Sequence, residues 1–145
     1  MTTTAASTSA SSSTSSVGFG TLLGQGLLGA AIAGAVNLVL YFGSHAAGVS
    51  YEGDFNGMPS LPVPMVFVSG IIMAIPASGV AWAFGRFTGN GARNYLILAV
   101  AFDLLSLGGP VGVKGLATGA LVVMELMHVV AGLGIAGLHF RALKK

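Results

Sequence analysis

Two ionisable residues inside an apolar stretch are the clearest candidates for chemistry in this sequence. Glu125 and His128 are three positions apart, so they share one face of a helix. The stretch around them, residues 116–138, is almost entirely apolar and is long enough to cross the ~30 Å hydrocarbon core of a bilayer. Because a carboxylate or an imidazole is costly in lipid, we expect both side chains to face the protein interior or a polar cavity.

Asn37 and Asp103 are further polar residues that the sequence places inside apolar stretches. At ~1.5 Å rise per helical residue, both lie about 8 Å from one end of the bundle, with Glu125 about 14 Å and His128 about 18 Å deep. We predict that the four form one polar cluster inside the membrane. One interpretation is that they satisfy one another by hydrogen bonds and fix the helix packing. The other is a site open to the outside that binds a ligand or exchanges protons.

The composition explains why these few polar groups stand out. The chain has 145 residues, of which 54% are hydrophobic and only 7% are charged. Soluble domains carry roughly 25% charged residues, so this chain is predicted to be an integral membrane protein. Its net charge of +2 comes from basic residues near predicted helix ends, which indicates topology signals rather than nucleic-acid binding. The absence of cysteine excludes disulfides and thiolate metal sites.

Four apolar segments predict an all-α bundle of four transmembrane helices. Residues 1–18 are a low-complexity Ser/Thr-rich segment with little to bury, which we expect to be a disordered tail. Residues 19–145 form the membrane domain, in which Pro76 lies deep inside the second helix and is expected to kink it. The predicted helices cover about 21–42, 63–84, 92–107 and 116–138.

Small residues indicate where these helices pack closely. Gly26, Ala30 and Gly34 lie on one face of the first helix, and Gly115 and Gly119 repeat a four-residue spacing at the start of the fourth. Such faces let a neighbouring backbone approach closely, because no large side chain separates the two helices. We therefore expect these residues to pack within the bundle or against a second copy or another membrane protein, with the lipid bilayer around them.

The distribution of lysine and arginine predicts the orientation. With both termini on one side, the opposite side holds only Lys114 and a long loop, residues 43–61, that contains Glu52 and Asp54. Basic residues collect on the cytoplasmic side of a membrane. We therefore predict a multi-pass protein of the cell membrane with both termini cytoplasmic and the acidic loop outside. The basic residues on the side of the termini are Arg86, Arg93, Arg141, Lys144 and Lys145.

No motif predicts a metal, a cofactor or a catalytic residue. The Glu-x-x-His spacing at Glu125 and His128 occurs in di-iron bundles, but those need a second such motif and two further glutamates. A haem held by two histidines would need a second copy of the chain, since His128 alone lies deep. The calcium-loop pattern is absent around Glu52 and Asp54, and no phosphate-binding loop or nucleophile elbow is found. The sequence thus favours a protein without catalytic activity.

Three segments, NLVLYFGSHAAGVSY, LSLGGPVG and LMHVVAGLGIAGL, resemble a bacterial family of small four-helix membrane proteins catalogued as a domain of unknown function. The resemblance covers residues 27–138. It implies the fold and the topology, and it carries no activity, substrate or cofactor. The matching features are Asn37, the Gly109–Pro110 turn and the Met127–His128 pair.

Two functions from different classes follow from these observations. The first is a non-enzymatic structural or accessory subunit of a membrane assembly, in which the polar cluster only orders the helices. The alternative is a carrier or conduit for a small solute, a cation or protons that uses Asp103, Glu125 and His128. A cavity that reaches these side chains would favour the alternative.

Overall fold

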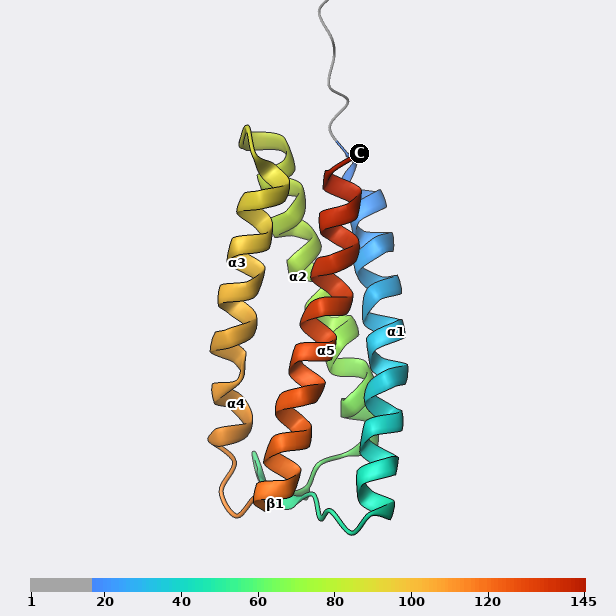
Figure 1. The fold of residues 1–145 in the computed structure, drawn as a ribbon, viewed down its shortest axis with the longest axis vertical. Coiled ribbons are helices and arrows are strands. Elements are labelled where there is room, and N and C mark those ends of the chain that lie inside the picture. The colour runs from blue at the N-terminus through green and yellow to red at the C-terminus, as the bar shows by residue number, and fades with distance from the viewer. Residues whose placement is uncertain (1–16) are drawn as a thin grey trace, which may run out of the picture.

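The computed structural model describes residues 17–145 and shows four long helices side by side (Figure 1). A single-turn helix, α4 (Gly108–Val111), follows the third long helix. All four runs are long and apolar enough to cross a bilayer when α4 is counted with α3. The predicted four-helix membrane fold is confirmed, while residues 1–16 of the predicted tail lie outside the described residues. The long helices are α1 (Phe19–Ala46), α2 (Val63–Phe87), α3 (Gly91–Ser106) and α5 (Thr118–Leu143).

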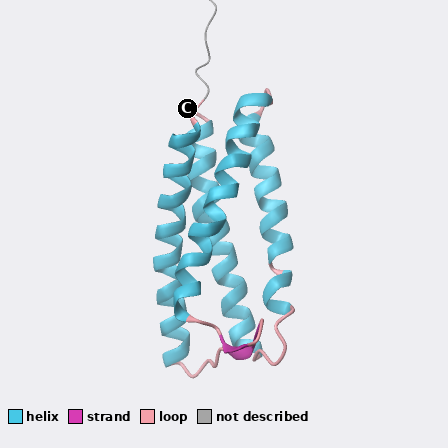
Figure 2. Ribbon diagram, turned by 180° about the vertical axis from the view of Figure 1, so that it is seen from behind, coloured by secondary structure: helices cyan, strands magenta, loops and turns pink. Residues whose placement is uncertain are grey.

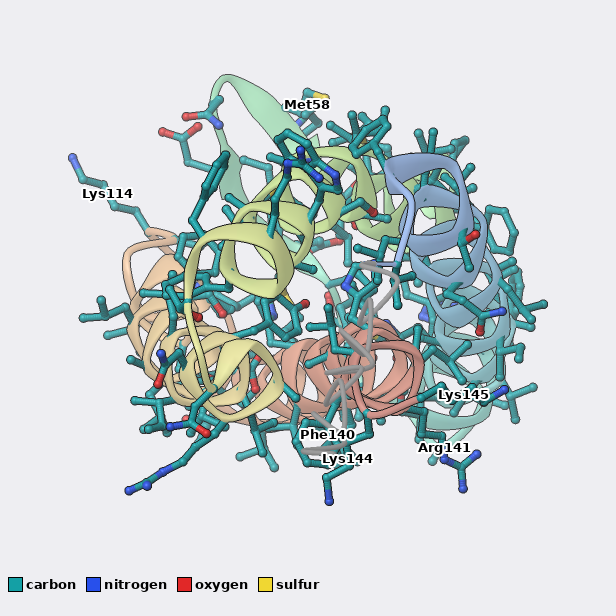
Figure 3. All side chains as sticks on the ribbon, turned by 90° about the horizontal axis from the view of Figure 1, so that it is seen from above. Met58, Lys114, Phe140, Arg141, Lys144 and Lys145 are labelled. Atoms are coloured by element: carbon teal, nitrogen blue, oxygen red, sulfur yellow. The ribbon has the colours of Figure 1, made fainter. Side chains whose placement is uncertain are left out.

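The largest difference from the expected helix ends is at the C-terminus. The apolar run ends at Leu138, but α5 continues through Leu143. The last turn of a helix readily accepts basic residues, because they offset the partial negative charge of its free carbonyl groups. Lys144 lies over the ring of Phe140, with its Nζ atom 4.6 Å from the ring centre, beside Arg141 (Figure 3). The extension brings His139 into the helix.

The helices are arranged in a ring in the order α1, α2, α3, α5, as the view along the bundle shows (Figure 3). α1 packs extensively against both α2 and α5. α3 packs against the same two helices from the opposite side, and α1 and α3 do not touch. The bundle therefore has a tight side around α1 and a side that α3 closes.

Small residues make the tight side. Gly29 of α1 lies directly on the backbone of Gly134 in α5, so a Cβ atom on Gly29 would overlap the Gly134 carbonyl group. Gly34 faces the ring of Phe67 in α2, and Ala30 is fully buried. In lipid there is no hydrophobic force that drives helices together, so van der Waals contacts between closely packed helices stabilise the bundle.

Gly115 and Gly119, the other two glycines that were expected to pack helices together, do not lie between helices. Gly115 lies in the turn before α5 with φ +78°, a conformation that favours glycine, so it belongs to no helix face. Gly119 is in the first turn of α5, and a Cβ atom there would meet the Val49 side chain at an ordinary van der Waals distance. Here the four-residue spacing reflects a turn and a loop contact instead of a helix–helix contact.

The long loop after α1 contains a hairpin that the sequence analysis did not predict. Strand β1 (Glu52–Phe55) pairs antiparallel with β2 (Met58–Ser60) at one end of the bundle (Figure 2). The two residues between them, Asn56 and Gly57, both have positive φ, at 55° and 87°. This is the two-residue turn for which Asn-Gly is the preferred sequence. We call this end the hairpin end, and the end with Val17 and Lys145 the terminal end.

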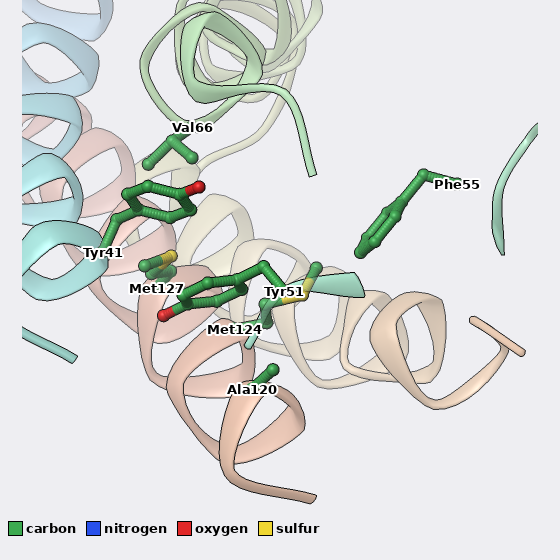
Figure 4. Packing of buried hydrophobic residues seen from close by; sticks show 7 residues of the cluster. All are labelled: Tyr41, Tyr51, Phe55, Val66, Ala120, Met124 and Met127. Carbon is green, nitrogen blue, oxygen red and sulfur yellow. The ribbon is translucent and has the colours of Figure 1, made fainter. Parts of the chain in front are cut away.

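The hairpin end is a folded cap over the helices. Tyr51 stacks on Tyr41 of α1, with ring centres 4.5 Å apart (Figure 4). Its hydroxyl group is hydrogen-bonded to that of Ser44. Burial raises the pKa of Tyr51 above its ordinary value, although the bond to Ser44 opposes this shift. The hydroxyl group therefore keeps its proton at neutral pH. The backbone N–H of Asp54 donates to the Lys114 carbonyl, which joins the two loops at this end.

A matched pair of glycines tests the close approach of α1 to α5. Gly29→Ala should destabilise the bundle by about 1–3 kcal/mol, because the added methyl group overlaps backbone that has to move. Gly24→Ala, in the same helix with open space around it, should be neutral or slightly stabilising. Thermal unfolding in detergent measures both. Equal unfolding temperatures for the two variants would contradict the packing.

Candidate functional site

An elongated groove lies between α2, α3 and α5, away from the tight side of the bundle. It encloses about 500 Å³ and its wall is mostly apolar. Along α2 the lining runs from Met65 to Val80, which is ~22 Å at helical rise. Binding sites for small molecules occupy ~300–1,000 Å³ and are mainly apolar with a few polar groups, so this groove has the size and character of one.

The groove opens sideways between α2 and α3. Its lining residues from these two helices include exposed side chains, with Met73 43%, Leu98 44% and Phe102 56% accessible. Its lining residues from α5 are less exposed, with Met127 at 6% and Ile135 at 7%. Hence α5 forms the floor, and α2 and α3 form the rims. In a bilayer, this opening faces the hydrocarbon of the lipids.

Asp103 and His128 meet in this groove. The Asp103 carboxylate comes from α3 and lies against Gly132 of α5, where a Cβ atom would overlap it. His128 also lines the groove, and its charge would interact with that of Asp103. Nδ1 of His128 is 2.8 Å from the Met124 carbonyl oxygen, and it must carry the proton because that oxygen can only accept. In neutral His128, Nε2 is therefore a hydrogen-bond acceptor.

Asn37 reaches the groove from α1. Its Nδ2 donates to the Met127 carbonyl at 3.1 Å, and this partner fixes the orientation of the amide. Its Oδ1 is then a buried acceptor without a partner among the described residues. The side chain is only 6% exposed, so water outside the protein does not reach it. A buried acceptor left open costs about 1–3 kcal/mol, which makes it a candidate ligand contact.

Glu125 lies beside the groove and does not line it. It is seven positions before Gly132, about two turns along the same side of α5, which faces α3. Its Oε2 is buried without a partner among the described residues. The structure thus brings Asn37, Asp103 and His128 to one groove. In the described part of the chain, none of the four predicted side chains forms a hydrogen bond with another. The expected hydrogen bonds among the four are therefore not observed.

A second polar cluster, which the sequence analysis missed, surrounds His139 near the terminal end. His139 is fully buried, and its Nδ1 is 2.7 Å from the hydroxyl oxygen of Tyr95 in α3. Its Nε2 is 3.0 Å from the Leu22 carbonyl oxygen of α1 and 3.1 Å from the Ser78 hydroxyl of α2. Nε2 donates, because a carbonyl group can only accept, and in the neutral ring Nδ1 then accepts from the Tyr95 hydroxyl group. One neutral imidazole in α5 thereby joins all four long helices.

The space for this imidazole comes from a glycine. A Cβ atom on Gly26 would be 2.6 Å from Nε2 of His139 and 2.7 Å from Oγ of Ser78. Ser78 donates to the Ala74 carbonyl at 2.6 Å, one turn back in α2 and two residues before Pro76. The signal that could have revealed this cluster was a histidine one residue after an apolar run, at helical spacing from Ile135. The helix continues for five residues after the last residue of the apolar run, so the run alone does not include His139.

The described residues hold no group of three or more His, Cys, Asp or Glu side chains arranged to bind a metal ion. At the hairpin end, Asp54 accepts from the backbone N–H of Gly57 at 2.7 Å and so closes the hairpin turn. Its carboxylate thus has a local structural partner.

Comparison with known proteins places the chain by family. A family model described as "Family of unknown function (DUF6069)" matches residues 18–145. No curated protein and no solved structure gives a significant match. The family match confirms the resemblance to a domain of unknown function, and it assigns no activity.

The His139 cluster predicts a specific loss of stability. Tyr95→Phe removes the only donor to Nδ1 and should cost about 1–3 kcal/mol, because a buried acceptor loses its partner. Tyr41→Phe is the control, since the Tyr41 hydroxyl has no hydrogen-bond partner among the described residues. Thermal unfolding in one detergent compares the two. The network would be refuted as a stabilising element if Tyr95→Phe were as stable as Tyr41→Phe.

Proposed function

Since the chain belongs to the family of unknown function DUF6069, we propose its function from its own geometry. It is a non-enzymatic membrane protein that binds a chain-like apolar molecule from the bilayer. The observation that carries the proposal is the groove of about 500 Å³ with an apolar wall and an opening toward lipid. A binding role also fits an accessory subunit that presents or holds such a molecule for another membrane protein.

The shape of the groove supports a chain rather than a compact molecule. Its lining extends ~22 Å along α2 and ~18 Å along α5, from Met124 to Ala136. Several lining side chains are methionines, whose flexible thioethers adapt to irregular apolar partners. An acyl or isoprenoid chain has this length and chemistry, and it is already present in the hydrocarbon that the opening faces.

The alternative that the sequence predicts, a carrier or conduit, fits the geometry of this groove less well than a binding role does. Asp103 and His128 line it, but Glu125 does not. A conduit needs a path to both sides of the membrane. The lining ends at Val80, Tyr95 and Ala136, where Tyr95 is bonded to the buried His139. The arrangement favours binding over conduction.

The orientation remains as the sequence predicts it. Five of the six lysines and arginines are at the terminal end, and Lys114 is at the hairpin end. We propose that the terminal end is cytoplasmic and the hairpin end is outside. The polar part of the groove, around Asp103 and Asn37, then lies in the outer half of the bilayer. Packing against a second copy or another membrane protein stays a prediction.

Photolabelling tests the binding role. Diazirine-bearing hexadecanol, added to the protein in nanodiscs, should label Met127 and Ile135 in a saturable way, because only a molecule inside the groove reaches these buried residues. Val39 and Leu133, which are 73% and 70% exposed, should be labelled in proportion to the probe in the lipid. Mass spectrometry of peptides locates the labels. Labels confined to exposed residues would rule out the proposed function.

A matched pair of variants sharpens this test. Ala99→Phe should abolish saturable labelling, because Ala99 lines the groove and the ring would fill it. Ala101→Phe, two residues along α3 on an exposed surface outside the groove, should leave labelling unchanged. If both variants are labelled as the wild type is, the hydrocarbon chain of the probe does not occupy the groove.

Cysteine labelling tests the orientation. The protein contains no cysteine, so Ser50→Cys at the hairpin end and Gly89→Cys at the terminal end each introduce one thiol. Both positions are exposed, and a Cβ atom on Gly89 meets open space. An impermeant thiol reagent on intact cells should label Ser50→Cys alone, with both labelled after the cells are opened. The reverse pattern would place the termini outside.

A further inference from the structure

We infer that the groove selects long-chain molecules whose polar end is a primary ammonium group. The inference rests on the proposed function, namely the binding of a chain in the groove, and it adds the chemistry of the head group. What points to it is an excess of unused hydrogen-bond acceptors in the polar part of the groove, around a carboxylate that has His128 nearby but no lysine or arginine among the lining residues.

Three hydrogen-bond acceptors there have no donor among the described residues. Oδ1 of Asn37 has no partner among the described residues, although the side chain is only 6% exposed. The Asp103 carboxylate lines the groove, and no described residue donates a hydrogen bond to it. Nε2 of neutral His128 accepts, because Nδ1 carries the proton that goes to the Met124 carbonyl. An ammonium group carries three donors and no acceptor, which complements this set.

Most hydrogen-bond donors of the lining are already engaged, and the Ser69 hydroxyl group is the exception among the described residues. Ser106 donates to the Asp103 backbone carbonyl at 2.7 Å, and Tyr95 donates to His139 at 2.7 Å. Nδ2 of Asn37 donates one of its hydrogens to the Met127 carbonyl. Lysine and arginine are absent from the residues that line the groove. A carboxylate or phosphate head group would therefore find few donors, and Asp103 would repel it.

The position of these groups sets the direction of the bound chain. Asp103 is three residues before the end of α3, and His128 is at the middle of α5, so the acceptors belong to the half of the groove toward the hairpin end. From there the lining toward the terminal end is apolar, through Met73, Leu98 and Ile135 as far as Tyr95. The ammonium group lies near Asp103 and the hydrocarbon runs toward the terminal end.

Competition between ligands that share one hydrocarbon chain and differ in the head group tests the inference. Diazirine-bearing hexadecanol is added to the full-length protein in nanodiscs as the probe. Unlabelled hexadecylamine, hexadecanol or palmitate is then added as a competitor, and the decrease in probe attached to Met127 is measured for each. Hexadecylamine should displace the probe at a concentration at least about tenfold lower than hexadecanol, as expected for charge-assisted hydrogen bonds. In Asp103→Asn this advantage should disappear while the probe still labels Met127.

Gly132→Ala provides a second variant that keeps the charge. A Cβ atom at Gly132 overlaps the Asp103 carboxylate, which is the end of a flexible side chain and is displaced without unfolding the backbone. The ammonium advantage should fall in Gly132→Ala and persist in Gly137→Ala, where a Cβ atom in the same helix meets open space.

The outcomes separate the two proposals. If Met127 is never labelled, chain binding itself fails. If Met127 is labelled but hexadecylamine competes no better than hexadecanol, or palmitate competes best, chain binding stands and the ammonium inference is overturned. If the advantage survives both Asp103→Asn and Gly132→Ala, the ammonium group is not held at Asp103 and the inference is likewise overturned.

Discussion

The contact between the backbones of Gly29 and Gly134 is the constraint on which the rest of the bundle depends. It brings α1 and α5 closer than any larger residue would permit, while Gly34 and Ala30 let α2 approach α1 on the adjacent face. Because α1 touches α2 and α5 but not α3, all of this close packing is on one side. On the other side, methionine and phenylalanine side chains separate the helices, and the groove lies between them. The tight side and the groove are thus two results of one distribution of residue sizes.

Buried polar groups then fix how α3 completes the ring. His139 satisfies both of its ring nitrogens by contacts with the other three long helices, since Nε2 donates to the Leu22 carbonyl and Nδ1 of the neutral ring accepts from the Tyr95 hydroxyl group. Polar side chains inside a membrane protein commonly join helices in this way. The groups at Asp103 and Asn37 are different, because no donor from residues 17–145 bonds their side-chain acceptor oxygens. The two clusters illustrate a satisfied network and an open one within a single bundle.

The fold could be predicted from the sequence because it follows from length and composition. The four apolar segments, the small-residue face of α1 and the position of the loops need no knowledge of distant contacts. Two misses had local signals: Asn56–Gly57 is a strong hairpin sequence, and His139 continues the helical spacing of α5. The groove had none. Its existence depends on how far α3 lies from α2, and that distance is set by contacts between residues far apart in the chain, such as Asp103 with Gly132.

The polar cluster was predicted as four residues, and three of them line the groove. Glu125 is about two turns before Gly132 on the same side of α5, but it lies beside the groove with its Oε2 buried.

The hydrogen bond between Asp54 and Lys114 has a mechanical consequence for the groove. It ties the segment after α4 to the hairpin, and the Tyr95–His139 bond ties the start of α3 to α5. A helix anchored near both ends widens the gap to its neighbour by bowing at its centre rather than by swinging outward. For the binding role proposed above, widening the groove would therefore require α3 to bend.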